Sequence, residues 1–298
     1  MLEDRKKIII DTDNGDDIDD LIALYFALSM PEKFEIIGVV CSFLNAPLRV
    51  KQVEHVLKLH GISNIPVYAG CRKPINGIHG QNEKEIYCQY FDFLGKANDV
   101  GYDDALNFII DSAKKYKGDL YFIEIAPQTT LANAILKDKE AFKDTHIVMM
   151  AGCFQEDYAE WNIECDYKAS QIVLESGLDL TYVGHDITIQ TTLNDPNIEK
   201  YFLQSYKDEK LQFLSLSANA WRNASNRPIV LHDILALLSI TDSKLCKFKK
   251  ANISFIEKDG HYYTVFDNDS CFAANIATDV NLPLLYDYVK KLMKGETK

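Results

Sequence analysis

Residues 8–21 read IIIDTDNGDDIDDL, an apolar run that leads into six aspartates within ten positions. The β-branched isoleucines predict a buried strand, and Gly15 provides a break at which the chain turns away from it. Carboxylates this close together repel one another unless a cation or a polar ligand lies among them. Oxygen-rich groups of this kind suit a hard cation such as Ca²⁺ or Mg²⁺ rather than zinc. The stretch therefore predicts a strand with a ligand site at its carboxyl end.

Short apolar runs and amphipathic stretches alternate along the chain that follows. We expect strands over Lys7–Asp11, Phe34–Cys41, Pro66–Ala69, Asp119–Ile125, His146–Ala151 and Leu180–Val183. We expect helices between them over Asp17–Met30, Leu48–His60, Asp103–Tyr116, Gln128–Lys137 and Asp166–Glu175. This βαβα rhythm predicts an α/β fold in which a mostly parallel, open, Rossmann-like sheet is flanked by helices. Ligands of such sheets bind beyond the carboxyl ends of the strands, where Asp11 and Asp13 lie.

The last third of the chain has a different character. We expect helical stretches over Asn197–Arg222 and Leu231–Ile240, a β-hairpin over Ile253–Ile256 and Tyr262–Phe266, and a final helix over Leu282–Lys294. Lys258-Asp259-Gly260 supplies the turn of the hairpin. No Pro/Gly-rich linker or repeat divides the sequence, so we expect residues 1–298 to form a single domain. The least regular internal segment, Gly70–Asp99, is expected to be an active-site loop.

The composition bounds the class of protein. With 47% hydrophobic and 26% charged residues, a chain of 298 residues has enough apolar side chains for a large core. Its net charge of −12 argues against nucleic acid and anionic membranes as partners. Seven scattered cysteines form neither a disulfide framework nor a CxxC metal site, and the first residues lack the apolar segment of a signal peptide. We therefore expect a cytoplasmic protein with reduced thiols.

The aspartate cluster admits several interpretations. An EF-hand loop that starts at Asp11 needs glycine at its sixth position and glutamate at its twelfth, but the glycine is at the fifth and Ile22 is at the twelfth. A phosphotransferase with Asp11 as nucleophile and Asp13 as general acid fits the strand context, but it leaves the second acid pair without a task. The acids that follow the turn, Asp16 and Asp17, suit a helix N-terminus. That last interpretation does not account for the acids that precede the turn.

A family resemblance accounts for both groups of acids. Asp11-Thr12-Asp13, Gly15 and Asp19-Asp20 resemble DxDPGxDD, the signature of the inosine–uridine-preferring nucleoside hydrolase family. This chain has Asn14 in place of the proline and two additional residues before the last acid pair. Five further matches follow in order: Asn45 after the second strand, Ile78-His79-Gly80, Ala126-Pro127-Gln128-Thr129-Thr130 for GPLTN, Ala159-Glu160-Trp161-Asn162 for AEFN, and Leu231-His232-Asp233 for an HD pair.

The resemblance implies an enzyme that hydrolyses the N-glycosidic bond of ribonucleosides to ribose and free base, in purine and pyrimidine salvage. It implies that Asp13, Asp20, Asp233 and the Thr129 carbonyl bind Ca²⁺, with Asp13 also acting as the base that activates a metal-bound water. Asp11 would orient the turn or another ligand. Family members are commonly dimers or tetramers, so a homodimer or homotetramer is expected.

The same resemblance implies how the substrate is held. Asp19, Asn45, Glu160 and Asn162 would bind the hydroxyls of ribose, and His79 would lie near the sugar and base. His232 would be the general acid that protonates the leaving base. The alternative is a non-catalytic protein of the same fold that binds a metal and ribose, or a nucleoside, without hydrolysis.

Several further positions depart from the family pattern, among them Phe154, Leu44 and Thr130. Phe154 stands six residues before Glu160, where members usually carry an asparagine that contacts the 5′ side of the sugar. Leu44 replaces the glycine that usually precedes Asn45, and Thr130 replaces the asparagine of GPLTN. These departures leave the metal ligands intact and leave open which nucleoside, modified or not, is the substrate.

Overall fold

Strand β1 (Lys6–Thr12) forms where the isoleucine run predicts a strand, and it lies at the centre of the sheet. The computed structural model describes residues 5–76, 89, 91, 94–95 and 101–294. Ile8 and Ile10 enter the apolar cluster on one face of the sheet, whereas Ile9 enters the cluster on the other face. A strand buried on both faces reads as a continuous apolar run, because neither set of alternating side chains meets water.

Within the described residues, nine strands form one sheet in the order β3-β2-β1-β4-β5-β6-β9-β7-β8. The neighbours from β3 to β9 pair in parallel, and β7 pairs antiparallel with both β9 and β8. The remaining strands are β2 (Phe34–Cys41), β3 (Val67–Ala69), β4 (Leu120–Glu124), β5 (His146–Met150), β6 (Asp179–Val183), β7 (Cys246–Lys258), β8 (His261–Phe266) and β9 (Ala273–Val280).

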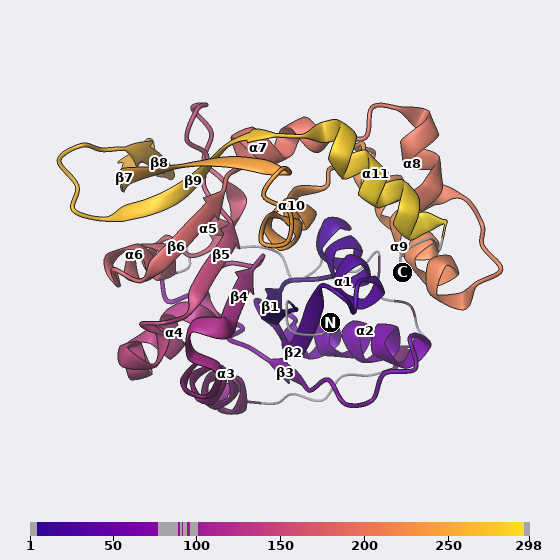
Figure 1. The fold of residues 1–298 in the computed structure, drawn as a ribbon, viewed down its shortest axis with the longest axis horizontal. Helices are drawn as coiled ribbons and strands as arrows, with labels where there is room; N and C mark the ends of the chain where they lie inside the picture. Colours follow the sequence, from indigo (N-terminus) through magenta and orange to yellow (C-terminus); the bar gives the residue numbers. More distant parts are fainter. Residues whose placement is uncertain (1–4, 77–88, 90, 92–93, 96–100, 295–298) are drawn as a thin grey trace.

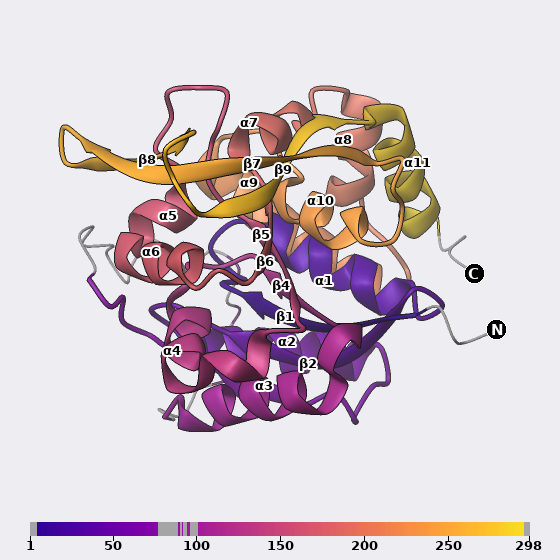
Figure 2. The same cartoon turned by 60° about the vertical axis from the view of Figure 1, so that its left-hand side comes forward.

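Helices cover both faces of the sheet, as Figures 1 and 2 show. One face packs against α1 (Asp19–Ser29), α2 (Ala46–Leu59), α10 (His232–Ser239) and α11 (Leu282–Met293), with α8 (Pro196–Leu203) and α9 (Glu209–Ser225) outside them. The opposite face packs against α3 (Asp103–Tyr116), α4 (Thr129–Asp138) and α6 (Tyr167–Glu175). Two short helices, α5 (Trp161–Cys165) and α7 (His185–Thr188), follow β5 and β6, and 3₁₀ turns occupy Lys117–Asp119, Lys139–Phe142 and Ile189–Thr191.

The α/β class, the mostly parallel open sheet and the flanking helices are therefore confirmed. The strand over Phe34–Cys41 and the helix over Asp103–Tyr116 have the predicted bounds. The hairpin is present as β7 and β8, with Asp259 and Gly260 at positive φ in its turn. In the part of the chain that the structure describes, no helix is both long and apolar enough to cross a membrane.

Two predictions about the last third are corrected. The helical stretch over Asn197–Arg222 is two helices, because α8 ends at Leu203 and α9 begins only after Asp208, whose side chain caps it by accepting a hydrogen bond from the Leu211 N–H at 3.0 Å. Strand β7 begins at Cys246 rather than Ile253, and its first half pairs with β9, a strand that the sequence does not predict.

The loop after β2 reaches the edge of the sheet at which β1 and β4 end. Phe43 and Leu44 adopt left-handed backbone conformations, with φ of 67° and 40°. Their N–H groups donate to the carbonyls of Cys71 and Arg72, each at 2.8 Å, and these bonds hold the turn. A side chain with a Cβ is disfavoured in this region. The conformation explains why a glycine suits the position of Leu44.

Candidate active site

The aspartate turn lies at the carboxyl end of β1. The Thr12 hydroxyl donates to Asp20 Oδ1 at 2.6 Å and accepts from the Asn14 N–H at 3.1 Å, which ties the turn to the start of α1. Helices α1 and α10 lie side by side, and the N–H of Asp233 donates to Asp19 Oδ2 at 3.3 Å. Carboxylate oxygens of Asp19, Asp20 and Asp233 lie within 4.8 Å of one another, and all three side chains are buried.

Burial is the main cause of the electrostatics of this cluster. It raises the pKa of Asp19, Asp20 and Asp233 well above the ordinary value, and the neighbouring carboxylates raise each pKa further. Burial also raises the pKa of Asp13 to about 7, against the opposing charge of Arg49. Buried acids with oxygen donors this close together need protons or a cation to offset their repulsion. The donor set therefore fits a hard divalent cation.

Arg49 supports the turn, and the sequence analysis did not identify it. It is fully buried on α2, and its guanidinium donates to the carbonyls of Phe43 at 3.1 Å, of Asn14 at 3.0 Å and of Asp13. One side chain thus fixes both the aspartate turn and the strained loop after β2. The sequence signal that could have identified Arg49 is its helical spacing from Gln52, Val53 and Val56, which lie on the buried face of α2.

Asp11 accepts the last hydrogen bond of a chain that runs through the hydroxyl groups of Thr130 and Ser42. The Cys71 N–H donates to Thr130 Oγ1 at 2.9 Å, Thr130 lies 2.6 Å from Ser42 Oγ, and Ser42 donates to Asp11 Oδ1 at 2.5 Å. Because the proton of Ser42 goes to Asp11, Thr130 is the donor in the hydroxyl pair. Burial raises the pKa of Asp11 to about 8, and the Ser42 bond lowers it. Thr130, which departs from the family pattern, thus holds the hydroxyl that orients Asp11.

Glu124, like Arg49, was not identified from the sequence, and it is a buried acid. It ends β4 directly opposite Asp11 in the parallel pairing of β1 and β4. Burial raises its pKa well above the ordinary value, and Asp11 raises it further. Among the described residues, Asp11 Oδ2 and Glu124 Oε2 have no hydrogen-bond partner. A lone acid at the end of an apolar strand is the signal that could have identified it.

The segment with the AEFN resemblance forms the start of α5. The Glu160 carboxylate caps this helix, accepting from the N–H groups of Asn162 at 2.8 Å and Ile163 at 3.1 Å, and also from that of Gly152 at 3.0 Å. Burial raises the pKa of Glu160 to about 7, and these N–H groups oppose the rise. The Asn162 amide donates to the Met150 carbonyl at 3.0 Å. Both side chains therefore have fixed positions beyond β5.

The remaining sequence-predicted residues are placed as follows. Asn45 is half-buried at the N-terminal end of α2. Thr129 begins α4, its hydroxyl donates to Asp166 Oδ2 at 2.6 Å, and its carbonyl accepts from the Asn133 side-chain amide at 2.8 Å. The role of this carbonyl as a metal ligand stays a prediction. His79 lies outside the described residues.

His232 begins α10, next to Asp233, and is half-buried. Its Nδ1 lies 2.7 Å from Thr188 Oγ1, and the Thr188 hydroxyl also donates to the His185 carbonyl at 3.3 Å. When both bonds form, the Thr188 hydroxyl donates its proton to the His185 carbonyl. The bond to His232 is then donated by Nδ1 of the imidazole. Burial, followed by the neighbouring His185, lowers the pKa of His232 to about 3. The imidazole is therefore neutral at physiological pH in the free protein.

Phe154 belongs to the apolar cluster on one face of the sheet. Its side chain is buried, and its ring packs edge-on against Tyr182, with centroids 5.7 Å apart, and at a tilt of 34° against Phe266, with centroids 5.6 Å apart. Its N–H donates to Asp186 Oδ1 at 3.1 Å. The ring that stands at the position of the family asparagine is thus a packing residue of the loop after β5.

Comparison with known proteins agrees with this geometry. Residues 8–287 match the family described as inosine-uridine preferring nucleoside hydrolase. Uridine nucleosidase 1 of Arabidopsis thaliana is 28% identical over 271 residues, covering 84% of this chain and 78% of that protein. Probable uridine nucleosidase 2 of the same plant is 31% identical over 231 residues, covering 71% of this chain and 68% of that protein.

A solved structure gives the same result. The purine-preferring ribonucleoside hydrolase from Gardnerella vaginalis superposes with a TM-score of 0.82 at 25% identity, covering 98% of this chain and 99% of that one. The resemblance noted from the motifs is therefore confirmed over nearly the whole chain. This protein belongs to the inosine-uridine preferring nucleoside hydrolase family and is a hydrolase that acts on N-glycosyl bonds.

Proposed function

We propose that this protein is a calcium-dependent ribonucleoside hydrolase in which Asp13 is the general base. The observation that carries the proposal is the buried group of Asp19, Asp20 and Asp233, with Asp13 at the end of β1 close enough to raise the pKa of Asp20 and Asp233. Asp13, Asp20, Asp233 and the Thr129 carbonyl would hold the ion. When bound, Ca²⁺ would lower the pKa of the attacking water and fix the position of that water.

Asp13 is suited to take the proton of that water. A base must be unprotonated to accept a proton: burial raises the pKa of Asp13 to about 7 in the metal-free protein, and a bound cation would lower that pKa and favour the carboxylate. The Arg49 guanidinium holds the Asp13 carbonyl, so the carboxyl group has a fixed backbone. Asp11, with its hydroxyl chain, would orient the turn without touching substrate.

Ribose would be held by Asp19, Asn45, Glu160 and Asn162, with His79 near the sugar and base. Carboxylates and amides match the donors and lone pairs of a vicinal diol. Loss of the 2′-hydroxyl leaves such groups unpaired, which costs far more than the loss of an apolar contact. The anionic surroundings also favour the oxocarbenium-like transition state over the neutral substrate.

His232 is our candidate for protonating the leaving base. Because its pKa is about 3 in the free protein, it must take up a proton as the substrate binds in order to act as an acid. A leaving base that gains electron density beside the imidazole raises that pKa by favouring the charged form.

Several finer points stay predictions. The named relatives act on uridine or prefer purines, so the choice of base, and with it a place in purine or pyrimidine salvage, is for the assay to decide. A homodimer or homotetramer and a cytoplasmic location are expected from the sequence. The small-molecule substrate follows from the family.

A release assay tests the proposal. Purified protein with Ca²⁺ is given matched pairs of ribonucleosides and 2′-deoxyribonucleosides, and free base and reducing sugar are measured. We expect release from at least one ribonucleoside and a rate on its deoxy counterpart that is lower by about 10⁴-fold. Binding of ribonucleosides without release of base from any of them would instead establish the non-catalytic binder.

A further inference from the structure

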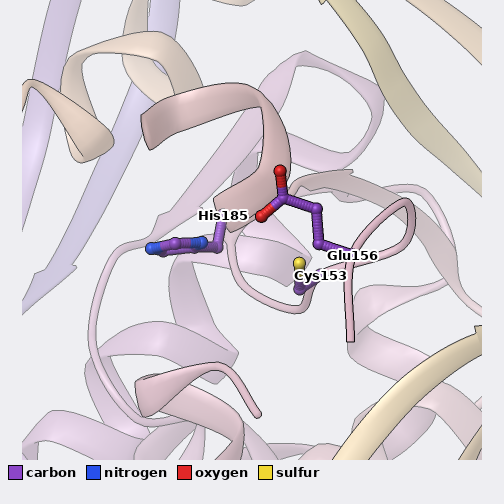
Figure 3. Close-up of side chains that lie close together, drawn as sticks. All are labelled: Cys153, Glu156 and His185. Carbon is purple, nitrogen blue, oxygen red and sulfur yellow. The ribbon is translucent and has the colours of Figure 1, made fainter. Parts of the chain in front are cut away.

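A second group of metal-binding side chains lies on the loop after β5, separate from the acid cluster. Ligand atoms of Cys153, Glu156 and His185 lie within 4.8 Å of one another. Figure 3 shows the Glu156 carboxylate above the Cys153 thiol and beside the His185 imidazole. Cys153 and Glu156 come from this loop, and His185 begins α7 after the neighbouring strand β6.

Two hydrogen bonds with Thr264 fix the backbone of Cys153. Thr264, on β8, accepts from the Cys153 N–H at 2.7 Å and donates to the Cys153 carbonyl at 2.8 Å. Burial raises the pKa of the thiol to about 11, whereas backbone N–H groups of Glu156 and Asp186 act in the opposite direction. N–H groups directed at a sulfur favour its anionic form, which is the form that binds metals.

The imidazole is also oriented, and one of its nitrogens has no hydrogen-bond partner among the described residues. The ring of His185 stacks on Tyr158, with centroids 4.1 Å apart and planes at 20°, and lies 5.5 Å from the ring of His232. Its Nδ1 is buried and makes no hydrogen bond with any described residue. A buried ring nitrogen in that condition indicates that a ligand completes it.

Thiolate, imidazole and carboxylate together select a different metal from the aspartates. Calcium prefers hard oxygen ligands, whereas a sulfur–nitrogen–oxygen set is typical of Zn²⁺ and related borderline ions. A tetrahedral zinc site places its ligand atoms roughly 3.3–3.6 Å apart, given its usual bond lengths. Glu156 is exposed, so its side chain is free to move the short distance required.

We propose that Cys153, Glu156 and His185 form a second metal site, which takes Zn²⁺ or a similar divalent ion and leaves one coordination position open. Binding releases the thiol proton to solvent and forms a bond from the metal to sulfur. The loop that would carry the ion also places Gly152 against Glu160 at 3.0 Å. The site thus adjoins the segment proposed to bind ribose without sharing a residue with it.

Cobalt absorption tests the site without relying on hydrolysis. Chelator-treated protein is supplied with excess Ca²⁺ to fill the acid cluster and then titrated with Co²⁺. We expect a thiolate-to-cobalt charge-transfer band in the near ultraviolet that saturates at about one equivalent and disappears when Zn²⁺ is added. Cobalt on the aspartates gives no such band, so a failed hydrolase proposal would not alter the readout.

Variants assign the band to these residues. Cys153→Ser should abolish it, and Glu156→Gln, which changes only an exposed side chain, should weaken cobalt binding about tenfold or more. The matched control is Cys246→Ser, another buried cysteine that lies on β7, and it should retain the band and the affinity. The absence of a band in the wild-type protein, or an equal band in folded Cys153→Ser protein, would overturn the proposal.

Discussion

Asp13 is the residue to which the proposed base role is assigned. Its pKa rises to about 7 through burial, with Arg49 opposing the rise. We predict that Asp13→Asn lowers kcat by about 10² to 10⁴-fold, the usual contribution of a general base, while nucleoside binding remains measurable by calorimetry. Asp111→Asn, on the exposed side of α3, is the control and should keep wild-type turnover. Full turnover in the Asp13→Asn protein would remove the base role.

His232 is predicted to matter only when the leaving base needs a proton. His232→Ala should therefore reduce kcat on natural ribonucleosides about 10² to 10⁴-fold but leave hydrolysis of a nitrophenyl riboside nearly unchanged. The activated leaving group departs as a stable anion and gains nothing from an acid. Parallel kinetics on the two substrate types measure the difference, and equal losses on both would exclude the acid role.

Glu160 should leave a signature in the pH dependence of stability. Its pKa is raised to about 7 in the folded protein, above the value of about 4.3 expected when unfolded. The stability that this raised pKa contributes is therefore fully present below about pH 4 and is lost as the pH rises through 7, by up to about 4 kcal/mol. The Glu160→Gln protein lacks this titration.

Urea unfolding of the wild-type and Glu160→Gln proteins at several pH values measures this effect. We expect the variant's deficit in unfolding free energy to shrink between pH 5 and pH 8. Glu175→Gln, at the exposed end of α6, should follow the wild-type slope. A deficit that stays constant with pH would show that Glu160 does not titrate in this range.

At the residue scale, the sequence identifies the acids and misses their supports. Asp19, Asp20 and Asp233 stand in recognisable motifs, and the structure brings their carboxylate oxygens within 4.8 Å of one another. Arg49 and Glu124 act through contacts between elements that are distant in the chain, α2 with the aspartate turn and β4 with β1. A single sequence does not carry such pairings, so their roles become apparent only once the fold is known.

The hairpin of β7 and β8 is the element that holds the loop after β5. Thr264, on β8, both donates to and accepts from the backbone of Cys153. Thr264→Val would leave a buried N–H and a buried carbonyl unpaired, which costs about 1–3 kcal/mol. We predict a loss of unfolding free energy of that size and a rise in KM, because the loop leads into the ribose-binding segment.

The matched control for the hairpin is Thr278→Val on β9. Thr278 makes a single exposed hydrogen bond to the Lys247 carbonyl at 3.2 Å, so its removal should cost less than about 0.5 kcal/mol. Chemical denaturation and steady-state kinetics on both variants provide the comparison. Equal effects of the two substitutions would mean that the hairpin does not support the loop.

Helices and strands are predicted correctly where the pattern of apolar residues is strong. They are missed where pairing with other strands determines the structure. The β-branched runs of β1 and β2 are buried on both faces and read as strands from sequence alone. Strand β9 reads AANIATDV, and its small residues carry little signal, yet it joins β6 and β7 inside the sheet. The break between α8 and α9 is set by the capping side chain of Asp208, which periodicity does not show.

For the whole molecule, the central claim is that the buried acid cluster is a calcium site on which hydrolysis depends. Ligand binding to the folded state alone raises stability, so removal of the ion should lower the melting temperature as well as the activity. Thermal unfolding with and without chelator measures the first effect. An unchanged melting temperature in protein shown to be calcium-free would contradict a cation bound at this cluster.

The most direct test follows activity and bound calcium together. Chelator-treated protein is titrated with Ca²⁺ while ribose release from its best ribonucleoside substrate is measured. We predict that activity falls at least 10²-fold on chelation and returns fully when about one Ca²⁺ is bound per chain. Full activity in calcium-free protein, or failure of Ca²⁺ to restore it while Mg²⁺ does, would contradict the account.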